Sequence, residues 1–196
     1  MKKSTKKEIL QYSIFLIIAL TLYMTGLHTE VIGFVQRGIV STGLLNPHLN
    51  ISNNDANGKK IKADLGLLLI DESGKTIALE ELEGKVIFIN LWATRCPPCI
   101  AEMPGINALY KEFKDEDDVK CLMISLDNNF ETAKSFIKRK GFEFEVYTPR
   151  NLPVMYDSGS IPSTFIIDKE GNLVLTHKGM ADYDTSKFKE FIRQLK

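Results

Sequence analysis

The longest apolar run of the chain lies near its N-terminus. Residues 9–27 are predominantly apolar and follow a start that contains Lys2, Lys3, Lys6 and Lys7. About 19 helical residues extend roughly 28 Å, which is near the thickness of a bilayer's hydrocarbon core. The pattern predicts a basic cytoplasmic tail over 1–8 and a transmembrane signal anchor over 9–27.

A cleaved signal peptide is the alternative for this run, because it would also have a basic start and an apolar centre. The stretch 24–28 offers no small-x-small cleavage site, which favours the uncleaved anchor. No cysteine follows the run directly, which disfavours a lipoprotein anchor. The lysines in front of the run predict a single-pass protein of the inner (cytoplasmic) membrane, with the remainder of the chain extracytoplasmic.

Residues 28–60 form a predicted membrane-proximal segment and linker. Apolar residues over 29–45 partly follow a helical period, but glycines interrupt them. Two interpretations remain open, a segment along the membrane surface and a flap over the following domain. Residues 46–60 are rich in Asn, Gly and Lys and are typical of a polar linker.

Short alternating and helical patterns fill residues 61–196. Strands are predicted over 63–70, 76–79, 86–91, 119–126, 142–147, 160–168 and 173–177, and helices over 100–113, 130–140 and 186–195. Pro104 is expected to kink or end the first section of its helix. The alternation predicts a mixed α/β sheet with helices on both faces.

Composition narrows the classes of function. The 196 residues are 44% hydrophobic and 26% charged, which fits one well-packed domain after the N-terminal segment. Lys and Arg balance Asp and Glu at 25 each, so net charge gives no reason to expect a nucleic-acid partner. Three cysteines are too few for a disulfide framework, and Cys121, inside a predicted strand, is expected to be a small core hydrophobe.

The other two cysteines form a Cys-Pro-Pro-Cys pair, Cys96 and Cys99, between the buried strand and the helix after it. The first-turn amides of a helix lack intrahelical partners, and the helix dipole adds positive charge there. Both effects favour a thiolate, which is the form that attacks a disulfide. The prolines suit a first turn, where a missing N–H costs nothing. The pair predicts a thiol–disulfide oxidoreductase.

Two longer motifs surround this pair. Residues 84–94 precede it, Glu102-Met103-Pro104 follows it, and the run 161–168 with Gly171 lies downstream. Together they resemble the TlpA/ResA-like family of membrane-anchored extracytoplasmic thioredoxins over about residues 62–196. The resemblance implies a thioredoxin fold for the domain 61–196. A bare Cys-x-x-Cys is also half of a zinc site, but no second pair at ligand spacing exists, so no metal is predicted.

The resemblance implies a role for each cysteine and for the acid near them. Cys96 would be the exposed nucleophile, and Cys99 would resolve the mixed disulfide. Glu102 would relay protons during the reaction. The alternative for Glu102 is a solvated glutamate on the helix surface.

The resemblance also implies a substrate-binding set. Pro162 would be a cis-proline that faces the disulfide, and Ile161 would offer backbone hydrogen bonds to a substrate peptide. Trp92, Arg95 and Pro97 complete the predicted set, with Trp92 packing beneath the active site.

Two residues depart from the pattern. Many relatives carry an aromatic residue where this chain has Arg95, whose guanidinium would favour the thiolate of Cys96 and alter substrate choice. Asn90 stands where cytoplasmic thioredoxins carry a buried aspartate. Because Asn cannot titrate, proton transfer would fall to Glu102 or to water.

The favoured function is a membrane-tethered dithiol reductase of extracytoplasmic proteins, with apocytochrome c haem-attachment cysteines or other oxidoreductases as implied targets. Neither a nicotinamide nor a flavin fingerprint is present, so the Cys96–Cys99 disulfide is the sole redox group expected. Electrons would come from a membrane thiol transporter. The alternatives are a disulfide-forming oxidant that uses the same site and a non-catalytic docking module for envelope assembly. A peroxidase is disfavoured because Ala93 stands where its threonine is needed.

Overall fold

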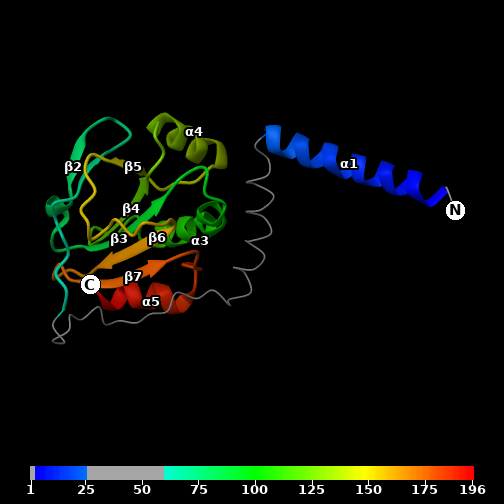
Figure 1. Ribbon diagram of the computed structural model, residues 1–196. Coiled ribbons are helices and arrows are strands. Elements are labelled where there is room, and N and C mark those ends of the chain that lie inside the picture. Colours follow the sequence, from blue (N-terminus) through cyan, green and yellow to red (C-terminus); the bar gives the residue numbers. More distant parts are fainter. Residues whose placement is uncertain (1–2, 26–59) are drawn as a thin grey trace.

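The computed structural model describes residues 3–25 and 60–196 (Figure 1). The first range is helix α1 (Lys3–Thr25), which begins earlier and ends earlier than the predicted run over 9–27. Within the described ranges, no helix meets the length and hydropathy needed to cross a membrane. The predictions for the segment and linker over 28–59 lie outside the described residues.

Residues 60–196 build one mixed sheet whose strand order is β2-β1-β5-β4-β3-β6-β7. The strands are β1 (Leu68–Ile70), β2 (Thr76–Ala78), β3 (Val86–Trp92), β4 (Val119–Ser125), β5 (Val146–Pro149), β6 (Ser163–Ile167) and β7 (Leu173–Lys178). Strands β3, β4 and β5 are parallel, whereas β6 runs antiparallel to β3. Every residue of β3 is buried, which explains its continuous apolar run.

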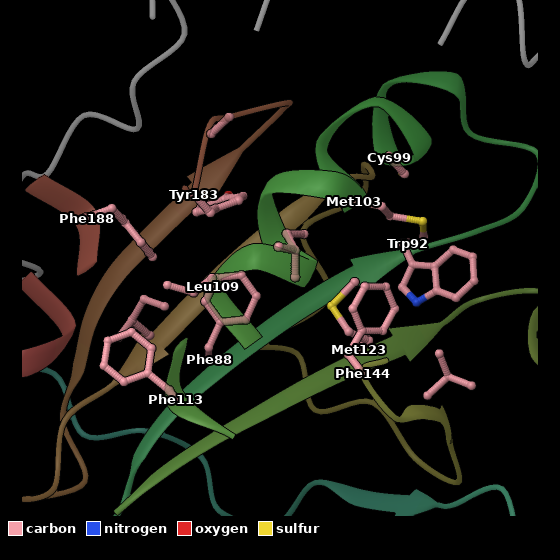
Figure 2. Packing of buried hydrophobic residues seen from close by; sticks show 14 of the residues in the cluster. Phe88, Trp92, Cys99, Met103, Leu109, Phe113, Met123, Phe144, Tyr183 and Phe188 are labelled. Carbon is pink, nitrogen blue, oxygen red and sulfur yellow. The ribbon is translucent and has the colours of Figure 1, made fainter. Parts of the chain in front are cut away.

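The helices of this unit are α3 (Pro97–Phe113), α4 (Phe130–Lys140) and α5 (Ser186–Gln194). All three contribute to a single core cluster, which also takes Val86, Phe88 and Trp92 from β3 (Figure 2). The prediction of helices on both faces is therefore wrong for the described domain. Both parallel crossovers, through α3 and through α4, advance the sheet in the same direction, and their common handedness puts both helices on the same face.

The other face of the sheet is covered by short irregular segments. The odd-numbered residues of β3, Ile87, Ile89 and Leu91, pack there with Leu79 of the 3-10 helix η1 (Leu79–Leu82) and with Tyr156. Tyr156 belongs to the segment between β5 and β6, which later borders the candidate site.

Three predicted elements differ in the structure. The strand predicted over 63–70 shortens to β1, because the Asp64 carboxylate accepts the Gly66 N–H and turns the chain. The strand predicted over 142–147 begins at Val146, since Phe142 and Phe144 instead stack with ring centroids 5.3 Å apart. Helix α3 begins at Pro97 rather than at 100 and continues through Pro104, so this proline does not end the helix.

Candidate active site

The two cysteines lie where β3 leads into α3. Cys96 is the N-cap of α3 and forms a disulfide with Cys99, with an S–S distance of 2.03 Å and a Cα–Cα distance of 5.3 Å. Pro97 and Pro98 occupy the first helical turn, as predicted. Cys96 is 7% exposed and Cys99 is 1% exposed, so both are buried and the expectation of an exposed Cys96 is wrong for the oxidised protein. An incoming thiol or disulfide therefore reaches Cys96 more readily than Cys99.

The start of α3 directs a backbone donor at the outer sulfur. The Cys99 N–H donates to Cys96 Sγ at 3.3 Å. In the reduced protein such a donor, together with the positive end of the helix dipole, stabilises a thiolate on Cys96. The arrangement can therefore supply a nucleophile and, one turn further into the helix, a second thiol to displace it.

Glu102 follows Cys99 by three residues on α3 and is 1% exposed, so the solvated interpretation of this residue is wrong. Asn90 Nδ2 donates to Glu102 Oε1 at 2.8 Å, and the Ala181 N–H donates to Oε2 at 3.1 Å. Burial raises the pKa of Glu102 to about 8, although both hydrogen bonds act in the opposite direction. The side chain can thus hold or accept a proton near neutral pH.

Asn90 joins Glu102 to a second buried pair. Its Nδ2 also donates to Thr164 Oγ1 at 3.0 Å, and the Tyr183 hydroxyl donates to the same oxygen at 2.6 Å. Burial, reinforced by the Glu102 charge, raises the pKa of Tyr183. Asn90 Oδ1 has no hydrogen-bond partner among the described residues. Sequence reasoning missed Thr164 and Tyr183, because no motif marks them and tertiary packing brings them together.

The Ile161–Pro162 peptide bond is cis, as the resemblance implied for Pro162. It immediately precedes β6, where Ser163 pairs with Leu91 near the end of β3. The cis bond therefore lies at the same end of the sheet as the cysteines. Ile161 is half-buried and Pro162 is buried.

Arg95 is exposed and rests against a buried carboxylate. Its Nη1 lies 3.5 Å from Asp127 Oδ1, and the side chains of Arg95 and Asp127 are 64% and 7% exposed. Asp127 also accepts hydrogen bonds from the Thr94 N–H, the Thr94 hydroxyl and the Ser125 hydroxyl. The carboxylate, which sequence reasoning missed, offsets part of the positive charge expected beside Cys96.

Trp92 is fully buried in the core cluster with Cys96 and Cys99 (Figure 2). Its ring centroid lies 6.0 Å from that of Phe136. A side chain with no exposed surface makes no contact with a substrate, so the inclusion of Trp92 in the substrate-contacting set is wrong for this state. Its predicted position beneath the cysteines agrees with the packing.

Cys121 packs against the same cluster and is not part of the site. Burial raises the pKa of its thiol to about 12. A thiol with that pKa carries almost no thiolate at neutral pH, so Cys121 is a poor nucleophile.

A cysteine pair at the start of a helix, held at the C-terminal end of a central strand of a mixed sheet and at the same end as a cis-proline, is the arrangement of the thioredoxin fold. The class that this fold and site define is the thiol–disulfide oxidoreductases. The family model described as Redoxin matches residues 56–192. The chain belongs to this family, and within it to the ResA-like thiol–disulfide oxidoreductases.

Individual relatives agree with this placement. The thiol-disulfide oxidoreductase ResA of Halalkalibacterium halodurans is 35% identical over 132 residues, which cover 66% of this chain and 74% of that protein. ResA of Bacillus subtilis is 36% identical over 109 residues, which cover 55% of this chain and 60% of that protein. The exposed lipoprotein thioredoxin of Streptococcus pneumoniae superposes with a TM-score of 0.55 at 27% identity, covering 65% of this chain and 98% of that one.

Proposed function

We propose that the chain is a membrane-tethered, extracytoplasmic dithiol reductase of protein disulfides. The observation that supports it most directly is the unequal exposure of the two cysteines at the start of α3. Cys96, the outer one, takes the position of a nucleophile, and Cys99 takes that of the residue that resolves the mixed disulfide.

The reaction begins when the Cys96 thiolate attacks one sulfur of a substrate disulfide. A Cys96–substrate disulfide forms, and the other substrate sulfur leaves as a thiolate that takes a proton. Cys99, deprotonated, then attacks Cys96 Sγ and displaces the second substrate thiolate. The substrate gains two electrons, and the enzyme ends as the Cys96–Cys99 disulfide.

Glu102 is assigned the role of accepting the proton that Cys99 loses before it attacks Cys96. Glu102 lies one turn further along the same helix. The raised pKa makes its ionised form, which is the minority at neutral pH, a base strong enough to accept a proton from a thiol. Asn90 and the Ala181 N–H hold its two oxygens, so the carboxyl group keeps one orientation during the exchange. The Ile161 backbone, next to the cis bond, is assigned the role of hydrogen-bonding an extended segment of the substrate.

Tethering is supported by the order of lysines and apolar residues at the N-terminus. In the part of α1 whose side chains are described, 7–18 and 20–21, the apolar side chains are exposed, including Ile9, Phe15 and Leu16. Insertion into a lipid bilayer would remove these apolar side chains from water. The structural relative from Streptococcus pneumoniae is named an exposed lipoprotein, which agrees with an extracytoplasmic domain.

Each reduced substrate leaves the enzyme oxidised, so a partner must return two electrons. The proposed donor is a membrane thiol transporter, and the proposed substrates are extracytoplasmic proteins with oxidised cysteines, such as apocytochromes c or other oxidoreductases. ResA-like relatives are named oxidoreductases without a direction. The reduction potential, measured by equilibration with glutathione, decides whether the protein reduces or oxidises its substrates.

A protein-disulfide reduction assay tests the proposal. Reduced wild-type protein should reduce insulin, Cys96→Ser should be inactive, and Cys121→Ser should keep wild-type activity as the matched cysteine control. Activity that survives in Cys96→Ser would eliminate the dithiol mechanism. An inert wild-type protein would instead support a docking module.

A further inference from the structure

A groove of about 210 Å³, here called the side groove, opens beside the redox pair. It is lined by Leu91, Arg95, Leu126, Leu152, Ile161 and residues 157–160. Two of these residues adjoin the reactive centre in the chain, since Arg95 precedes Cys96 and Ile161 precedes the cis-proline. A segment of substrate that reaches Cys96 is therefore already at the mouth of the side groove.

An exposed apolar side chain lies close in sequence to one of the residues that line the groove. Val154, two residues beyond Leu152, is 89% exposed. Across residues 60–196, no other large apolar side chain is exposed in this way. The groove itself has a mixed lining, in which Leu91, Leu126, Leu152 and Ile161 are apolar and Arg95, Asp157, Ser158 and Ser160 are charged or polar.

The segment that carries Val154 is fixed in place. Tyr156 is fully buried and its hydroxyl donates to the Asp64 carbonyl at 2.9 Å. The Ser158 hydroxyl lies 2.6 Å from the Ser160 carbonyl, and Lys178 Nζ donates to the Ser158 carbonyl at 3.1 Å. The groove is therefore formed before a partner arrives, which lowers the ordering cost of binding.

Two charged residues, Arg95 and Asp157, line the groove, and Arg95 is the one that precedes Cys96 in the chain. A guanidinium carries five N–H donors, and Arg95 uses one of them in a long contact of 3.5 Å to Asp127. The Asp127 carboxylate already accepts three shorter hydrogen bonds. The exposed donors of Arg95 are thus able to bind a second carboxylate in a paired geometry.

We propose that the side groove selects protein substrates that carry an acidic residue beside the reacting cysteine and an apolar residue further along. The acidic side chain binds Arg95, and the apolar side chain packs against Leu126, Leu152 and Val154. This inference rests on the proposed reductase function and names the substrate class for it. A disulfide without a peptide segment does not use the groove.

Peptide disulfides that differ at one position test the charge selection. Two extended peptides share one sequence with an apolar residue, and carry either Asp or Lys next to the cysteine. We expect the wild-type kcat/KM to be about threefold to fivefold higher for the Asp peptide, as for an exposed ion pair. Arg95→Gln should remove this preference and Arg95→Glu should reverse it.

The ratio of kcat/KM between the Asp and Lys peptides separates peptide binding from the reactivity of Cys96. Substitution of Arg95 also changes the surroundings of Cys96, but both peptides meet the same thiolate, so that change cancels in the ratio. Lys187→Gln, which removes an exposed cation from α5, is the matched control and should keep the wild-type ratio. A ratio unaffected by both Arg95 variants overturns the charge selection.

Val154→Ser tests the apolar part, since the residue is on the surface and its loss leaves the core intact. We expect kcat/KM for the peptides to fall about twofold to fivefold while reduction of dithiobis-nitrobenzoate is unchanged. If the peptide rate is unchanged in Val154→Ser, the proposal is overturned. It is also overturned if Val154→Ser changes only self-association or binding to phospholipid vesicles, because Val154 would then contact another copy of the chain or a membrane. A wild-type protein that reduces neither peptides nor the small disulfide refutes the reductase function instead.

Discussion

Glu102 is the residue whose chemistry differs most from its type. It is buried beneath the cysteines, and burial raises the pKa of its carboxyl group to about 8. The two hydrogen bonds from Asn90 and Ala181 favour the ionised form but are outweighed by desolvation. At neutral pH the protonated form therefore predominates, and a small change in the charge of the redox pair is enough to alter its occupancy.

The raised pKa has a consequence for stability. Between pH 4.5 and 8 the folded protein holds a proton on Glu102 that the unfolded chain has released. The contribution of Glu102 to the free energy of unfolding is present in full below this window and is lost as pH rises through it, by an amount of the order of a few kcal/mol. Glu102→Gln should flatten this dependence.

Urea unfolding of the oxidised protein at several pH values measures the effect. Glu83→Gln is the control, because Glu83 is exposed and its loss should leave the pH dependence as in the wild type. A Glu102→Gln variant that retains the wild-type decline would contradict the assignment of the raised pKa.

At the scale of elements, α4 shows how local chemistry sets helix ends. Asn129 accepts the Glu131 N–H at its N-terminus, and Gly141, with φ of 71°, ends it in the left-handed conformation. These two residues are favoured at those positions for steric and hydrogen-bonding reasons. The helix occupies Phe130–Lys140, which is the predicted range.

Removal of the cap gives an element-scale prediction. Asn129→Ala leaves the first turn of α4 without its side-chain acceptor, so the free energy of unfolding should fall by about 1 kcal/mol. Asn128→Ala, one residue earlier and exposed, should change it little. Equal losses in chemical denaturation of the two variants would argue against the capping role.

Elements were predictable where local signals agreed with tertiary packing. The strand that became β3 and the helix α4 carried clear patterns and formed close to their predicted bounds. The apolar alternation around Phe142 and Phe144 suggested a strand, but both rings are used to fill the core beside α3. The side of the sheet on which helices lie is a property of the crossovers, which periodicity does not contain.

The candidate site divides in the same way. Cys96, Cys99 and Pro162 stand in short motifs that the sequence displays directly. Thr164, Tyr183 and Asp127 join the site through contacts between segments distant in the chain, and single-residue patterns carry no trace of those contacts. Glu102 was named by resemblance, but its complete burial became evident only in the fold.

At the scale of the whole molecule, the proposal places the reactive pair outside the cytoplasm. In intact cells that express the full chain and have been treated with a reductant, a membrane-impermeant maleimide should label Cys96. A Cys96→Ser/Cys99→Ser variant retains Cys121 and should be labelled far more slowly until it is denatured, because that thiol is partly buried and poorly ionised. Labelling that requires opened cells would contradict the proposed orientation.

The single-face packing of the helices leaves the other face to short segments, and the segment 150–161 among them borders both the side groove and the cis-proline. The helical layer therefore buries Cys99, whereas the proposed substrate groove is bordered by the loop layer. In the proposed reaction, a substrate becomes linked to Cys96 and is released by Cys99.

Trapping of the mixed disulfide tests that claim most directly. The full chain with Cys99→Ala is reduced, mixed with a disulfide-bonded protein substrate and examined by non-reducing electrophoresis and peptide mass spectrometry. We expect a reducible one-to-one complex joined through Cys96, and we expect no such complex from the Cys96→Ser/Cys99→Ala double variant. A complex joined through Cys121, or no complex while the wild type reduces the same substrate, would contradict the account.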